Sequence, residues 1–178
     1  MHIAIIRHSI RNRGGDKLTL DYAQYLVSQG NTIDYWTNEV ASHFTIDKKI
    51  NIKRIPWLGV GGTLLFTFLN KFSYGIIIVD LVVMAFIASL RNKKALIYLA
   101  QDYDVTYHKS IIIKKFIHFC YQFVLNTFAT PTISVANGLS DKLSIYQPKR
   151  LKTVSNGVDT KLFFRDPQTA YLKDRQKK

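Results

Sequence analysis

Two short segments of this chain carry residue types that suit chemistry on a polar ligand. Gln101-Asp102-Tyr103-Asp104 directly follows an apolar run. A carboxylate at the end of a buried strand faces the ligand crevice in parallel α/β sheets, which makes Asp102 a candidate functional residue. His108 lies in the polar stretch that follows, near the edge of the same expected site. The alternative is structural, because Asp often caps the next helical element.

The second segment is Gly14-Gly15, between the first expected strand and the first expected helix. Two glycines let the backbone approach a ligand closely, and a helix N-terminus favours an anion. The pair is not a dinucleotide-binding fingerprint, because the spaced third glycine is missing. A phosphate-binding loop and a plain flexible turn both remain open at this point.

Other kinds of chemistry find little support in the sequence. The five histidines are scattered, and no His or Cys pair has the spacing of metal ligands. We find no nucleophile elbow, P-loop, zinc knuckle or RNA-binding aromatic signature. The single cysteine, Cys120, lies in an apolar helical run and is expected to be a buried thiol. The sequence therefore predicts a site without a metal or a resident cofactor.

The charge of the chain points to partners rather than to a fold. The formal net charge is +13 and the isoelectric point is near 9.8. Five basic residues are candidates for contact with an anionic surface: Arg11, Arg13, Lys17, Lys114 and Lys115. An anionic membrane, a phosphorylated substrate and a merely solvated surface all remain open. Nucleic acid is the least supported partner, because the positive charge favours it but no nucleic-acid-binding motif is present in the sequence.

Apolar runs and helical spacings alternate along the chain. Strands are expected at 2–6, 32–37, 50–55, 75–79, 95–100, 132–136 and 152–155. Helices are expected at 16–28, 61–72, 81–91, 109–128 and 139–146, with a loop at 7–15. We read the apolar stretch 74–90 as a strand and a helix of a core rather than as a membrane span, because Asp80 interrupts it.

This order predicts an α/β fold with a Rossmann-like parallel sheet and helices on both faces. Ligands bind such sheets beyond the carboxyl ends of the strands. These ends are expected at 7–15, Asp80, 101–108, Asn137 and Asn156. Asn156-Gly157 is also a turn signal, because both residue types tolerate positive φ.

Taken together, these motifs resemble the N-terminal half of members of the large "group 1" family of retaining GT-B glycosyltransferases. That family includes sucrose synthase-like, mannosyl- and rhamnosyltransferases. Asp16 matches the acidic residue that family members have after Gly-Gly, whereas Asn31 stands where they usually have His. Gln101, in Gln-Asp-Tyr-acid, replaces the more common His of a His-Asp motif and is typical of a rhamnosyltransferase-like subgroup. The matching segments span nearly the whole chain: Ile3-Ala4-Ile5-Ile6, Gly14-Gly15-Asp16-Lys17, Tyr22-Ala23-Gln24-Tyr25-Leu26, Gly30-Asn31-Thr32-Ile33, Tyr98 to Asp104, Ser134-Val135-Ala136-Asn137, and Val154 to Asp159 with Phe163.

The resemblance implies one acceptor-binding domain over 1–155 of a two-domain enzyme. Residues 156–178 would then be the hinge, at Asn156 and Gly157, and the start of the linker to a donor-binding domain beyond this chain. Catalytic roles fall to Asp102 and Gln101, and donor phosphate contacts to Gly14 and Gly15. The acceptor-side candidates are Arg11, Arg13, Lys17, Tyr103, His108 and Asn137.

The implied function is transfer of a sugar from a nucleotide-sugar to a cell-surface polysaccharide, glycan or lipid-linked acceptor, without a metal. The chain alone would then be inactive. The expected location is cytoplasmic, with peripheral contact at the inner face of the membrane left open. Two alternatives remain: half of a sugar-nucleotide epimerase of the same architecture, and a basic module that binds membrane or glycan.

Overall fold

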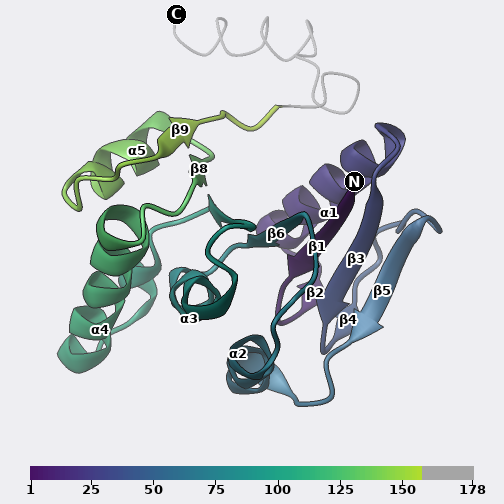
Figure 1. Ribbon diagram of the computed structural model, residues 1–178, viewed down its shortest axis with the longest axis horizontal. Coiled ribbons are helices and arrows are strands. Elements are labelled where there is room, and N and C mark those ends of the chain that lie inside the picture. The colour runs from purple at the N-terminus through teal and green to yellow at the C-terminus, as the bar shows by residue number, and fades with distance from the viewer. Residues whose placement is uncertain (158–178) are drawn as a thin grey trace, which may run out of the picture.

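A parallel sheet of seven strands runs through the residues that the computed structural model describes, 1–157 (Figure 1). Every neighbouring pair in this sheet is parallel. Its strands are β1 (His2–Ile6), β3 (Thr32–Thr37), β5 (Ile50–Arg54), β6 (Ile76–Val79), β7 (Leu96–Ala100), β8 (Thr132–Ser134) and β9 (Leu151–Thr153). Two short strands, β2 (Ile10–Arg11) and β4 (Val40–Ala41), pair separately. The predicted α/β fold is confirmed.

Helices connect most of these strands, as parallel strands require. They are α1 (Gly14–Ser28), α2 (Gly59–Leu69), α3 (Val82–Asn92), α4 (Ile111–Tyr121) and α5 (Asn137–Ser144). A 3-10 turn at Asp104–Tyr107 precedes α4, and a π-helical segment at Gln122–Thr127 follows it. In Figure 1, α2, α3 and α4 form one layer, in which α3 contacts both of its neighbours.

The alternation of side chains along β1 divides the core between the two faces of the sheet. Ile3 and Ile5 pack in one buried cluster with residues of α1, such as Leu20. Ala4 and Ile6 point the other way, into a larger cluster with residues of α3 and α4. Because both faces of β1 are covered, this strand is a continuous apolar run rather than an alternating one.

The strand order places a natural ligand crevice beside β1. The order across the sheet is β5-β3-β1-β6-β7-β8-β9, so the direction of strand addition reverses between β1 and β6. Open α/β sheets bind ligands at such a reversal, beyond the carboxyl ends of the strands. Arg7 follows β1 and Asp80 follows β6, so both residues lie at this point.

Two expectations about local structure were wrong. The segment 7–15 is not one loop, because it contains β2 and because α1 already begins at Gly14. The helix expected at 109–128 is not uniform, since α4 ends at Tyr121 and the chain continues as the π-helical segment. Phe123 and Phe128, at either end of that wider turn, both contact Phe86 of α3.

A buried carboxylate joins the strands at the opposite end of β1. Asp34 of β3 accepts hydrogen bonds from Tyr74 (2.7 Å) and Asn51 (2.8 Å), and Lys53 lies 2.8 Å away. Burial alone would raise the pKa of Asp34, but these three partners outweigh burial and hold the pKa at about 2. The carboxylate therefore stays charged at every physiological pH and cross-links this edge of the sheet.

The stretch 74–90 resolves into β6 and the start of α3, as expected. None of the helices within residues 1–157 combines the length and the apolar character that a membrane span requires. The expected hinge residues Asn156 and Gly157 are the last two described residues. The expected linker from 158 onward, with Asp159 and Phe163, lies outside the described part of the chain.

Candidate functional site

A cleft of about 730 Å³ lies where the strand order reverses. Its floor comes from the residues that follow β1, β6 and β7, namely Arg7, Asp80 and Gln101. Its apolar walls come from α2 and α4, through residues such as Leu64 and Phe116. The cleft therefore has a polar floor built from strand ends and an apolar rim built from helices.

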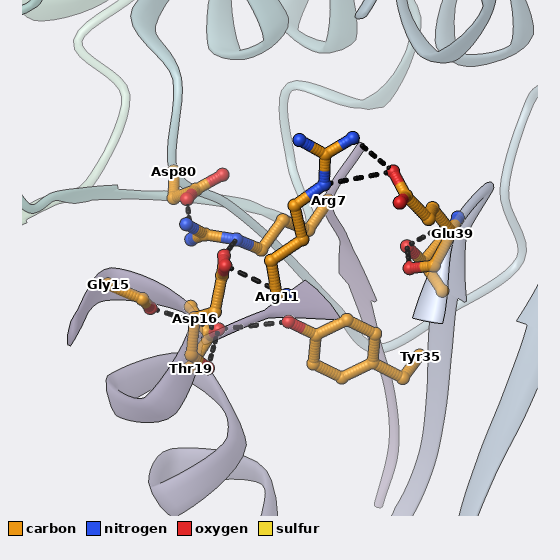
Figure 2. A network of polar contacts seen from close by, with 9 residues as sticks. Arg7, Arg11, Gly15, Asp16, Thr19, Tyr35, Glu39 and Asp80 are labelled. Atoms are coloured by element: carbon orange, nitrogen blue, oxygen red, sulfur yellow. Dashed lines mark hydrogen bonds and ion pairs between the residues drawn. The ribbon is translucent and has the colours of Figure 1, made fainter. Parts of the chain in front are cut away.

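The floor is organised by the guanidinium group of Arg7, which lies between two buried carboxylates (Figure 2). Its Nε donates to Asp16 Oδ1 at 2.5 Å, and its Nη1 donates to Asp80 Oδ2. The second oxygen of Asp16 accepts the backbone N–H of Arg11 at 2.9 Å. All three charged side chains are less than one-tenth exposed. The pairing joins the ends of β1 and β6 to the first turn of α1.

The first turn of α1 approaches this cluster so closely that a side chain at position 15 would displace Gln101. A Cβ on Gly15 would overlap the side-chain oxygen of Gln101 and would lie 3.2 Å from Nη2 of Arg7. A Cβ on Gly14 would meet nothing within 4 Å. Gly15 is thus the member of the pair that lets α1 approach the floor of the cleft.

The N-terminus of α1 keeps its hydrogen-bonding capacity. Its N-cap residue, Arg13, makes no side-chain hydrogen bond to the helix. The first N–H groups of an α-helix have no partner within the helix, and they favour a negative charge. Gly15 and Arg13 both line the cleft, so these groups lie at its edge.

Three buried polar atoms of the cleft have no hydrogen-bond partner among the described residues: His8 Nδ1, Asp80 Oδ1 and Gln101 Nε2. Buried polar atoms are nearly always paired, so each of these atoms has room for a hydrogen bond to water or to a polar ligand. Burial lowers the pKa of His8, and the charges of Arg7 and Arg13 lower it further. His8 is therefore neutral at pH 7 and offers an uncharged imidazole.

Asp102 is held in a fixed orientation by its own loop. Its Oδ1 accepts the backbone N–H of Tyr103 at 2.7 Å, and its Oδ2 accepts the hydroxyl of Tyr107. This hydrogen bond to Asp102 raises the pKa of Tyr107 to about 12, with burial adding to the effect. Both side chains line the cleft, so Tyr107 fixes the carboxylate of Asp102 at the cleft.

Asp104 has a structural role, although not the one that its position suggests. It caps α3, the helix before it in sequence, because its Oδ2 accepts the N–H of Val82 at 2.8 Å. Burial raises the pKa of Asp104 to about 6, and the neighbouring charge of Asp102 contributes in the same direction. The acid therefore titrates close to neutral pH.

This pKa predicts a stability that falls as pH rises. The pKa of Asp104 is 3.8 when unperturbed and about 6 in the fold, so the folded state binds the proton more tightly. Its contribution is greatest below pH 4 and is lost as pH rises to about 6. The loss is about 3 kcal/mol, at 1.36 kcal/mol per pKa unit.

We therefore expect Asp104→Asn to become more stable relative to the parent chain between pH 4 and pH 7. The amide oxygen can still accept the N–H of Val82. Urea unfolding at several pH values measures the difference, and Asp141→Asn, at an exposed position of α5, is the control. A difference that is constant with pH would contradict the raised pKa.

The structure brings together five of the residues singled out from the sequence: Arg13, Gly15, Gln101, Asp102 and His108 line one cleft. Gly14, Arg11, Lys17, Tyr103 and Asn137 are not among its lining residues. The five that line it come from two segments far apart in sequence, and both segments follow strand ends.

The residues outside the cleft have local partners instead. Arg11 pairs with Glu39 at 2.6 Å on the surface, and Lys17 pairs with Asp21 at 2.9 Å along α1. The hydroxyl of Tyr103 bonds that of Tyr146 at 2.7 Å. Asn137 is exposed at the start of α5, and the expected hinge residue Asn156 lies 3.5 Å from the hydroxyl of Tyr22.

Sequence reasoning missed the part that Arg7, His8 and Tyr107 play in the cleft. A usable signal existed for Arg7, because it is the first residue after a buried strand, as Asp80 and Gln101 are. No comparable signal marks Tyr107, since its role depends on one hydrogen bond within a loop. Within residues 1–157, no three His, Cys, Asp or Glu side chains converge closely enough to hold a metal ion.

No protein-family model and no curated protein sequence matches this chain. Two solved structures are similar to it in fold. Sucrose-phosphate synthase from Thermosynechococcus elongatus superposes with a TM-score of 0.70 at 11% identity, covering 98% of this chain and 52% of the other. WaaG, a glycosyltransferase involved in lipopolysaccharide biosynthesis, superposes with a TM-score of 0.65 at 12% identity, covering 98% and 51%.

These comparisons define the class of fold. The chain has the α/β, Rossmann-like fold of one half of a GT-B glycosyltransferase. It spans about half the length of each of the two proteins.

Proposed function

We propose that this chain is the acceptor-side half of a retaining GT-B glycosyltransferase. The enzyme would move a sugar from a nucleotide-sugar to a polysaccharide, glycan or lipid-linked acceptor, without a metal. The observation that carries the proposal is the cleft at the reversal of strand order, with its three unpartnered polar atoms. The similarity in fold to sucrose-phosphate synthase and to WaaG supports the proposal. WaaG is described as a glycosyltransferase involved in lipopolysaccharide biosynthesis.

The arrangement of the cleft suits a ligand with many hydroxyl groups. Gln101 Nε2 offers a donor and Asp80 Oδ1 an acceptor, while His8 Nδ1 adds a neutral group. Asp102 adds a fixed carboxylate. Sugars need donors and acceptors of this kind, because each hydroxyl can donate and accept.

The first-turn amides of α1, together with Arg13, suit the diphosphate of the donor. Preorganised N–H groups stabilise charge that develops on a leaving group. These amides and Arg13 supply only part of the positive charge and hydrogen-bond donors that a diphosphate requires. We therefore propose that a second, donor-binding domain completes the site. The match to about half of each similar protein supports this reading.

Binding measurements on paired glycine variants test the proposal. We expect the chain to bind oligosaccharide acceptors or nucleotide-sugars from a mixed panel, measured by calorimetry. Gly15→Ala forces the side chain of Gln101 to move, so we expect binding about 10-fold weaker, the effect of about 1.4 kcal/mol. Thermal stability should change little, because Gln101 contacts the added methyl with the end of a flexible side chain.

Gly14→Ala is the matched control. It makes the same chemical change in the same helical turn, where the added methyl group has free space. Equal effects of the two substitutions on affinity would mean that they act by changing the helical turn itself. The close approach of Gly15 to Gln101 would then have no part in binding. Failure of the parent chain to bind any member of the panel would contradict the proposed function.

A further inference from the structure

The outward face of α4 is apolar, which is the reverse of what a helix on the surface of a soluble domain normally presents. The exposed residues Ile111, Ile112, Lys115, Phe116 and Phe119 define this surface, which we call the α4 face. At 100° per residue they occupy an arc of about 140°. Four of the five are large hydrophobics, and Ile112 is 80% exposed. Ile111 is 71% exposed, and Phe116 and Phe119 are nearly half exposed.

The opposite side of α4 already supplies the contacts that the fold needs. Ile117, Cys120 and Tyr121 are buried in the main core cluster. On the α4 face, Phe119 also packs against Phe86 and Phe123, whereas Ile111 and Ile112 are more than two-thirds exposed. An apolar surface of this kind marks a place of interaction.

The charge around the α4 face has one sign. Helices α2, α3 and α4 contain three basic residues, Arg91, Lys114 and Lys115, and no acidic one. From residue 55 to residue 140 the acidic residues are Asp80, Asp102 and Asp104, and all three line the cleft. The outward surface of this layer thus offers apolar groups among lysines and arginines, without carboxylates.

Aromatic residues extend the surface toward α3. Phe119 contacts Phe86 with ring centroids 5.6 Å apart, and Phe86 contacts Phe128. Lys93 lies over the ring of Phe128, with Nζ 5.7 Å from its centroid. Rings flanked by basic side chains are the composition of helices that lie in the interface of an anionic bilayer.

We infer that the α4 face docks on an anionic lipid surface. The apolar side chains of α4 enter the interface while Lys115 on this face, and Lys114 at its edge, contact lipid phosphates. Phe116 belongs both to this face and to the lining of the cleft, so the cleft opens at the docked surface. If the proposed function holds, on which this last step rests, the acceptor is lipid-linked and reaches the cleft from the bilayer.

Double lysine variants test the docking in an assay that contains vesicles but no sugar donor and no acceptor substrate. The 178-residue chain is sedimented with phosphatidylcholine vesicles that contain or lack phosphatidylglycerol. We expect binding to the anionic vesicles alone, weakened by high salt. Lys114→Gln/Lys115→Gln should bind roughly 10- to 30-fold more weakly, from the attraction that each lysine near an anionic surface provides.

Lys48→Gln/Lys49→Gln is the matched control. It removes the same charge from an adjacent pair of exposed lysines in the loop before β5, and it should bind like the parent chain within about two-fold. Equal losses of vesicle affinity in the two double variants would show that net charge alone drives binding. That result would overturn the inference that the α4 face is the docking surface. Equal binding to neutral vesicles, or none to either kind, would overturn it as well.

Ile111→Ser/Ile112→Ser tests the apolar component. Both side chains are more than two-thirds exposed, so the variant should keep the circular dichroism spectrum and unfolding midpoint of the parent chain. We expect it to lose at least 10-fold in vesicle affinity. If the parent chain instead self-associates through these residues and does not bind vesicles, the partner is a second copy and the inference is wrong. A chain that binds vesicles but no sugar ligand would contradict the proposed function alone.

Discussion

Replacing Arg7 with Met lowers the free energy of unfolding by about 3–5 kcal/mol at neutral pH, the usual cost of removing one partner from a buried ion pair. Arg7 is the shared counter-cation of Asp16 and Asp80, and all three side chains are buried. Without it two carboxylates remain in the interior with no compensating charge. Urea unfolding followed by circular dichroism measures the loss.

Two further variants show whether the effect belongs to the ion cluster. Arg150→Met removes an exposed arginine and should change stability by less than about 0.5 kcal/mol. Arg7→Met/Asp80→Asn should be less destabilised than the sum of its single changes, because the neutral amide no longer needs a cation. Strict additivity of the two changes would argue that Arg7 stabilises the fold through its packing.

If the proposed function holds, Asp102→Asn lowers kcat by about 100-fold in the two-domain enzyme that the proposal describes. A hydrogen bond to a charged group contributes about 1.5–3 kcal/mol, and the amide also presents an NH₂ group where Asp102 accepts two hydrogen bonds. Asp102 is exposed, so the unfolding midpoint should stay within about 1 °C of the parent. Steady-state kinetics with labelled nucleotide-sugar measure the change.

Asp141→Asn is the control for this prediction, because it removes an exposed carboxylate from α5, away from the cleft lining. Tyr107→Phe removes the hydroxyl that orients Asp102 but leaves the carboxylate, so its kcat should fall about 10-fold. Normal turnover of Asp102→Asn would restrict Asp102 to the shaping of its loop.

The strands of the fold were largely predictable, because their evidence is local. The bounds expected for β1 and β3 are those observed, since β1 is a short apolar run and β3 alternates around Ile33 and Tyr35. The strand β2 was missed, because two residues become a strand only by pairing with β4, about 30 residues away. The sequence of a two-residue strand carries no periodicity of its own.

The candidate site was only partly predictable, for a related reason. Glycines and carboxylates after strand ends indicated Gly15 and Asp102 correctly as cleft residues. The ion cluster joins Arg7 to residues 9 and 73 positions away, and no short motif contains such a pairing. The position of Arg7 after a buried strand indicates its place at the cleft, but its two carboxylate partners are known only once the strand order is known.

The order in which strands join the sheet has a consequence for synthesis of the chain on the ribosome. Every strand of the main sheet after β1 pairs with a strand that precedes it in sequence: β3 and β6 with β1, β5 with β3, β7 with β6, β8 with β7 and β9 with β8. A chain that emerges at about 5–20 residues per second can therefore extend its sheet one strand at a time. No strand waits for a later one, so the exposed edge of the nascent sheet is covered as translation proceeds.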